Sequence, residues 1–109
     1  MNVCCHRLLL GILTVFVFAG CANIELTPQG EKVRLLSLQE VGKCRYIGKV
    51  SSSVTDRVGI ITRDPEVVRE EIAANARNSA GAMDGDTIVS VSPLTDGKQT
   101  FDVYRCINP

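Results

Sequence analysis

The sequence predicts an α+β fold: a small antiparallel sheet in the chain order β-β-α-β-β, with one helix packed on a face and a disulfide staple. One long amphipathic repeat between residues 64 and 85 predicts the helix. Two segments with strand-like patterns precede this repeat, and two follow it. A helix between two pairs of strands folds most simply as one sheet covered by one helix.

Two segments before the helix predict the first strands. Lys32–Ser37 alternates so that Val33 and Leu35 share one face, and a turn containing Gly42 follows. Cys44–Val50 alternates next and predicts the second strand. Its pattern does not decide which face is covered, because apolar residues fall on both.

Residues 51–63 are the least regular part of the predicted domain, and two interpretations of them stay open. The ordinary one is a long loop whose isoleucines tuck beneath the following helix. The other is an exposed apolar loop that docks a partner through Val58, Ile60 and Ile61.

Asp64 and Pro65 mark the start of the helix, because Asp caps free N–H groups and Pro is tolerated at the first helical position. The helix is expected to end between Gly81 and Gly85, where glycine can adopt the left-handed cap. The predicted buried stripe is Val68, Ile72, Ala76, Ala80 and Met83. The positions predicted to face water are Glu71, Asn75 and Asn78.

The β-branched segment Asp86–Ser92 predicts a third strand, central in the sheet because its apolar residues do not strictly alternate. Asp96-Gly97 is a hairpin-turn signal. Gln99–Cys106 then predicts the fourth strand, with Phe101 and Val103 on one face.

The N-terminus has the features of an export signal. Arg7 precedes the apolar run Leu8–Phe18, and Ala19-Gly20-Cys21 resembles the bacterial lipobox, where a leader is cut before a cysteine that receives lipid. The alternative is a membrane-spanning helix, which needs about 20 apolar residues, and this run is shorter. We therefore expect a signal peptide at residues 1–20 and lipidation of Cys21.

A lipid-modified Cys21 places the domain outside the cytoplasm. Each buried methylene contributes about 0.8 kcal/mol, so the acyl chains of a mature bacterial lipoprotein hold it at the membrane. Ala22 is not the Asp that resembles an inner-membrane retention signal, which favours the outer membrane, facing the periplasm. Residues 21–31 predict a lipid-anchored tether with a reach of up to about 35 Å, and residues 32–109 predict the single domain.

Cys44 and Cys106 are the cysteines expected to remain after the leader is removed and Cys21 is modified. The periplasm is oxidising, so we expect a disulfide that joins the second strand to the last. Closing a loop of about 60 residues stabilises a domain by roughly 4 kcal/mol on the chain-entropy model. A metal site and a redox-active pair are weaker alternatives, because the only histidine, His6, lies in the leader and the spacing is not C-x-x-C.

Composition argues against several function classes. Arg7 leaves with the leader, so eleven basic residues face twelve acidic ones, and no basic surface for nucleic acid is expected. Serine-type hydrolysis lacks its usual base, because the mature chain has no histidine. We expect no catalytic site, no metal and no cofactor. The acidic pairs Glu70/Glu71 and Asp84/Asp86 are interpreted as solvated or capping groups.

Six stretches of the mature chain carry a resemblance when taken together: Leu26–Arg34, Asp56–Gly59, Ala76–Ala80, Gly85–Thr87, Gly97–Phe101 and Val103–Cys106. Their order and spacing resemble a family of proteobacterial lipoproteins called domain of unknown function 4156. The resemblance implies a lipid-anchored α+β domain with a cysteine pair at Cys44 and Cys106. More distantly, the chain is similar to the Rcs stress-sensor lipoprotein of the outer membrane, in which a small disulfide-stapled domain signals through protein contacts.

We therefore expect a non-catalytic outer-membrane lipoprotein that acts through protein–protein contacts, in envelope maintenance or stress sensing. Its expected partners are the membrane, through the lipid anchor, and an envelope protein, but not nucleic acid. The alternative is a periplasmic small-ligand or anion-binding module. It would use four arginines along the helix edge, which are otherwise interpreted as solvated: Arg57, Arg63, Arg69 and Arg77.

Overall fold

A four-stranded sheet organises the chain in the computed structural model, which describes residues 24–109. The strands lie in the order β1 (Arg34–Leu35), β5 (Thr87–Ser90), β6 (Lys98–Arg105) and β2 (Arg45–Ser53). β6 is antiparallel to both of its neighbours. The α+β fold predicted from the sequence is confirmed, and β5 is central, as expected.

β1 departs from the prediction because it pairs with β5 in parallel. The chain leaves β1 for the opposite edge of the sheet through the 3-10 turn η3 (Leu38–Val41), so β1 and β2 are not neighbours. β1 is also shorter than the predicted strand. Val33 is buried whereas Leu35 is 53% exposed, so these two side chains do not share a covered face.

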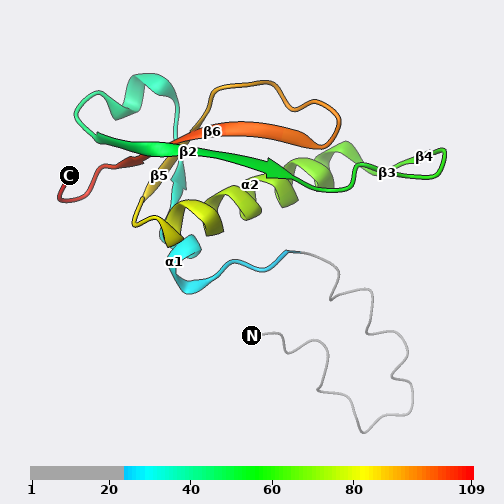
Figure 1. Ribbon diagram of the computed structural model, residues 1–109, viewed down its shortest axis with the longest axis horizontal. Helices are drawn as coiled ribbons and strands as arrows, with labels where there is room; N and C mark the ends of the chain where they lie inside the picture. Colours follow the sequence, from blue (N-terminus) through cyan, green and yellow to red (C-terminus); the bar gives the residue numbers. More distant parts are fainter. Residues whose placement is uncertain (1–23) are drawn as a thin grey trace, which may run out of the picture.

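Helix α2 (Pro65–Ala82) runs across one face of the sheet (Figure 1). It begins as predicted, with the Asp64 carboxylate accepting the Glu66 N–H at 3.0 Å. Its small residues permit close approach to the strands, where Ile72 is fully buried. The buried core consists of Val33, Val68, Ile72, Ala76, Ala80, Ile88, Phe101 and Val103. The predicted apolar stripe of the helix is thereby confirmed, and Met83 packs against its end.

β2 extends further than predicted and is fastened to α2. The sequence predicts a loop for its last residues, yet Ser52 is buried and its hydroxyl donates to the Ile72 carbonyl at 2.8 Å. That bond satisfies a polar group that would otherwise be buried without a partner. The register of β2 against β6 shifts between Tyr46 and Gly48, so Ile47 forms a bulge. Among the described residues, no strand pairs with the outer edge of β2.

The remaining connection of the sheet is the tight turn before β6. Asp96 and Gly97 both have positive φ, 51° and 71°, as a type I′ turn requires. A Cβ atom at Gly97 would collide with the Val54 carbonyl oxygen, so glycine is required for space as well. The hairpin signal in the sequence is confirmed.

A short helix, α1 (Pro28–Glu31), packs against α2 where the sequence predicted a tether. Two glycines allow this close approach. A Cβ atom at Gly30 would overlap the Asn78 side chain, and one at Gly81 would lie 2.8 Å from the Gln29 carbonyl carbon. The part of the predicted tether that the structure describes is therefore packed onto the domain.

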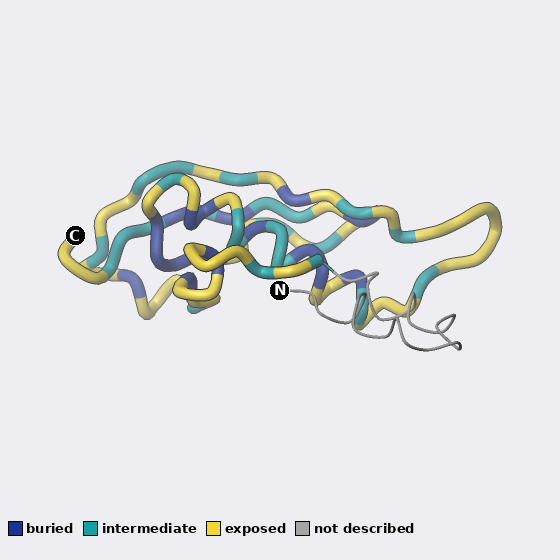
Figure 2. Tube along the Cα trace, turned by 90° about the horizontal axis from the view of Figure 1, so that it is seen from below, coloured by how far each residue is buried: buried dark blue, intermediate teal, exposed yellow. Residues whose placement is uncertain are grey.

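A second sheet of two short strands, β3 (Arg57–Val58) and β4 (Ile61–Thr62), follows β2. It forms a hairpin at the end of the molecule opposite the C-terminus (Figures 1 and 2). Within residues 24–109, no helix combines the length and apolar character that a membrane span requires.

The α1–α2 contact gives a direct prediction for Gly81→Ala. Alanine normally stabilises a helix by about 1 kcal/mol relative to glycine. Here the added methyl group meets the Gln29 backbone, so we expect a net loss of about 1–3 kcal/mol, as in other overpacked sites. The measurement is urea unfolding of the purified protein. Gly42→Ala is the matched control, because nothing lies within 4 Å of its Cβ position; stabilisation by both variants would contradict the close packing of α1.

Candidate functional site

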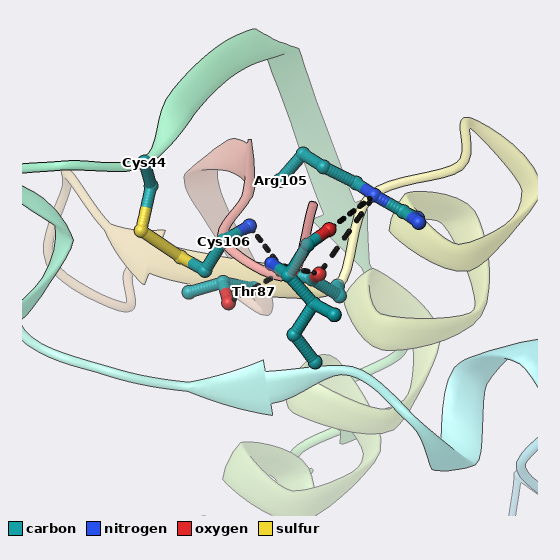
Figure 3. Close-up of a disulfide and its surroundings, with 6 residues drawn as sticks. Cys44, Thr87, Arg105 and Cys106 are labelled. Carbon is teal, nitrogen blue, oxygen red and sulfur yellow. Dashed lines mark hydrogen bonds and ion pairs between the residues drawn. A yellow bond between two sulfur atoms is a disulfide. The ribbon is translucent and has the colours of Figure 1, made fainter. Parts of the chain in front are cut away.

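The predicted disulfide is present and joins the two long strands. Cys44 directly precedes β2 and Cys106 directly follows β6, and their Cα atoms are 4.3 Å apart. The sheet register pairs Arg45 with Arg105, so the cysteines continue the ladder by one step. Figure 3 shows the bridge beside the C-terminal end of the chain. Cys21 and the predicted signal peptide lie outside the described residues.

Asp86, which the sequence predicts to be a solvated or capping residue, is bonded to the chain around this bridge. Its carboxylate accepts the backbone N–H groups of Cys106 at 2.7 Å and Ile107 at 2.9 Å. The Thr87 hydroxyl donates to it at 3.0 Å, and the Arg105 guanidinium approaches within 4.0 Å (Figure 3). Asp86 is 7% exposed. Of the two roles expected for Asp86, solvated or capping, the structure shows the second, because its carboxylate caps the backbone just beyond β6.

The environment of Asp86 keeps it ionised. Burial alone would raise its pKa, but the hydrogen bonds from Cys106, Ile107 and Thr87, helped by the charge of Arg105, outweigh burial and hold the pKa below the usual 3.8. An acid or base in catalysis needs a pKa near the working pH. Asp86 is therefore an anion at neutral pH, and its hydrogen bonds fix the disulfide segment.

A second, partly buried ion pair binds the base of the hairpin to α2. Arg63 donates from both terminal nitrogens to the two oxygens of Glu71, at 3.0 and 2.9 Å, and one nitrogen also donates to the Thr55 carbonyl at 2.7 Å. The hydrogen bond to Glu71 raises the pKa of Arg63. The prediction that Glu71 faces water is wrong, because Glu71 is 8% exposed and its carboxylate binds Arg63.

The hairpin tip brings together three of the exposed large apolar side chains among the described residues. Val58 is 65% exposed, Ile60 96% and Ile61 67%. Gly59 reverses the chain with a φ of 64°. The isoleucines do not tuck beneath α2, so the ordinary interpretation of this segment is wrong and its exposure is confirmed. Figure 2 shows this end as a continuous exposed stretch.

Two of the four arginines predicted as a possible anion site, Arg63 and Arg69, line one cavity at the base of the hairpin, whereas Arg77 lies nearer the other end of α2. Arg63 is held by Glu71, and Arg69 pairs with Glu66 on the exposed side of α2 at 3.2 Å. Arg77 donates to the Val33 carbonyl at 2.8 Å and thereby joins α2 to the segment before β1. Asn78, also predicted to face water, bonds instead to the segment before α1.

Two shallow cavities accompany these features. One, of about 220 Å³, lies at the base of the hairpin between Thr62, Val68 and Leu94. The other, of about 300 Å³, lies near Gln29, Arg105 and Ile107. Within residues 24–109, no group of three metal-ligating side chains converges in a way that would hold an ion.

These features define a small disulfide-stapled α+β domain with an apolar hairpin whose base is bound to α2. The family model of a domain of unknown function (DUF4156) matches residues 24–106. The chain belongs to this family, and the match covers the sheet, both helices and the cysteine pair. No curated protein and no solved structure shows significant similarity to it.

The bonding of Asp86 predicts a stability loss in Asp86→Asn. The amide cannot accept both backbone N–H groups, and leaving one buried donor unpaired costs about 1–3 kcal/mol at neutral pH. Because the folded-state pKa is lowered, the contribution of Asp86 is complete above the ordinary carboxyl pKa. It disappears as pH falls through the folded-state value, below 3.8.

Urea unfolding at pH 7 and near pH 2 measures this effect. The wild type and Asp86→Asn should differ at the higher pH and converge at the lower one. Asp84→Asn is the control, since Asp84 is exposed and uses its carbonyl, not its carboxylate, to accept from Arg105. If the stability difference between the wild type and Asp86→Asn were the same at both pH values, the charge of Asp86 would not be its cause.

Glu71→Gln is predicted to loosen the hairpin while leaving the core intact. It removes the charge and one of the two acceptor oxygens that hold Arg63. Amide hydrogen exchange should speed up at residues 57–63 and remain slow in β5 and β6. Glu66→Gln, which disturbs only the exposed pair with Arg69, should change neither region. Equal amide exchange at residues 57–63 in the two variants would show that Glu71 does not support the hairpin.

Proposed function

We propose that this protein is a non-catalytic lipoprotein of the bacterial outer membrane that acts by contacting another envelope protein through the tip of its β3–β4 hairpin. The anchor is the lipid expected on Cys21, and the role is envelope maintenance or stress sensing. The observation that carries the contact is the exposure of Val58, Ile60 and Ile61 on a hairpin whose base is held by the partly buried Arg63–Glu71 ion pair.

An exposed apolar tip is unfavourable in water, which supports a binding role. Each of its large aliphatic side chains would contribute about 1.5–3 kcal/mol if it were fully buried against a partner. The hairpin contributes little to the core of its own domain, since its three large side chains lie outside the buried cluster. Apolar groups concentrated in this way on a soluble domain mark interaction sites.

The mounting of the hairpin also supports docking. The Arg63–Glu71 pair and the Arg63 N–H bond to the Asp56 carbonyl, at 2.9 Å, fix the direction in which the tip leaves the domain. A binding element that is already oriented loses less conformational freedom on association. A protein with a complementary apolar groove fits this convex tip better than a small ligand, which needs a concave site.

Crosslinking in cells tests the proposed contact. With a photoreactive residue at Thr62, the anchored protein should give a specific crosslinked species. Ile60→Ser combined with Ile61→Ser should abolish it, because the apolar contact is lost. Leu38→Ser is the matched control, since Leu38 is 63% exposed in η3, away from the hairpin, and it should leave the crosslink unchanged.

Two further results make the test decisive. Cys21→Ser should release the folded protein from the membrane fraction, and mass spectrometry of the native protein should show an acylated N-terminal cysteine. An unmodified N-terminus would overturn the anchor. A crosslink that persists in the double Ile variant would overturn the hairpin as the contact site.

A further inference from the structure

The segment that follows the expected anchor is bound to α2 almost from its first residue. The Asn78 side chain accepts the Thr27 N–H at 2.8 Å and donates to the Glu25 carbonyl at 2.9 Å. The Thr27 hydroxyl in turn accepts the Gly30 N–H at 2.9 Å and caps α1. One helical side chain thus holds the backbone on both sides of Leu26.

Arg77 extends this attachment to the other end of α1. It donates to the Glu31 carbonyl at 3.2 Å and to the Val33 carbonyl at 2.8 Å. Together with the close packing permitted by Gly30 and Gly81, these bonds hold the chain against α2 from Glu25 to β1. We call residues 25–33, bound in this way, the latch.

The latch shortens the path from the anchor to the domain. Only residues 22–24 separate Cys21 from Glu25, so the stem spans at most about 14 Å even when fully extended. The tether expected from the sequence had a reach of about 35 Å. A domain of this size is roughly 30 Å across, so the stem is shorter than the domain that it holds.

We propose that the α1 side of the domain rests on the headgroup layer of the bilayer that holds the lipid of Cys21. This inference rests on the anchor in the proposed function. The exposed charged side chains named on this side, Glu25, Glu31 and Asp84 with Lys32, are mostly acidic, so charge does not attract this side to an anionic bilayer and stem length sets the contact. The partner of the hairpin is then confined to the layer next to the same bilayer.

The test uses the full lipidated protein in vesicles of phosphatidylethanolamine and phosphatidylglycerol that contain a nickel-chelating lipid. A nitroxide is attached at Glu31→Cys in α1 or at Gln39→Cys in η3. Both native residues are exposed, and Figure 1 places α1 below α2 and η3 above β2. Relaxation of the nitroxide by headgroup nickel should be several-fold stronger at position 31 than at position 39.

A flexible Gly/Ser insertion between Ala22 and Asn23 is the matched variant, because it lengthens the stem without touching the described domain. It should bring the two signals to the same low level. Asn78→Ala releases Glu25 and Thr27 from α2 and should also reduce the difference in nitroxide relaxation between positions 31 and 39. An unchanged unfolding transition of this variant shows that its core is folded.

Flotation of the vesicles is measured first, because it tests the lipid anchor separately from the orientation of the domain on the bilayer. Protein that fails to float overturns the anchor and this inference with it. Protein that floats but shows equal relaxation at the two positions with the native stem overturns the inference alone. A difference that survives the Gly/Ser insertion also overturns it, because stem length would then not be the cause.

Discussion

The packing of α2 on the sheet is the interaction on which every other feature of this domain depends. Ile72 and the neighbouring alanines bury one side of the helix against β5, β6 and β2. The other sides of the same helix then serve as attachment points: Glu71 holds the base of the hairpin, and Asn78 with Gly81 holds the latch. Because these elements attach to the helix and not directly to one another, its position on the sheet sets the position of each.

Much of the fold could be predicted because it rests on local signals. The helix start at Asp64-Pro65, its apolar period and the Asp96-Gly97 turn depend on nearby residues, and the structure confirms them. The parallel pairing of β1 could not be predicted, since it depends on where the chain goes after Leu36 and not on the pattern of the strand itself. The pairing of Cys44 with Cys106 followed from the expected compartment, and the sheet register supplies its geometry.

Two polar residues that the sequence pattern predicts to face water, Glu71 and Asn78, are bound by segments outside their own helix. Arg63, the partner of Glu71, lies only eight residues away, whereas the partners of Asn78 lie more than 50 residues away, and those of the capping residue Asp86 lie 20 or 21 residues away. A pattern within a helix or a turn contains no information about such a segment. In the hairpin the apolar residues are the exception. Val58, Ile60 and Ile61 are of the kind that normally fill a core, but they lie in a short two-stranded hairpin outside the core and are exposed.

The bulge at Ile47 affects whether copies of the protein can aggregate through the edge of the sheet. β2 offers nine residues of open edge, a template on which a neighbouring chain could add a strand. Attachment to a membrane would confine many copies to two dimensions and raise their effective concentration. The irregular register and the charge of Lys49, which is bound to Asp102 at 2.7 Å, interrupt that template and oppose edge-to-edge aggregation in a crowded layer.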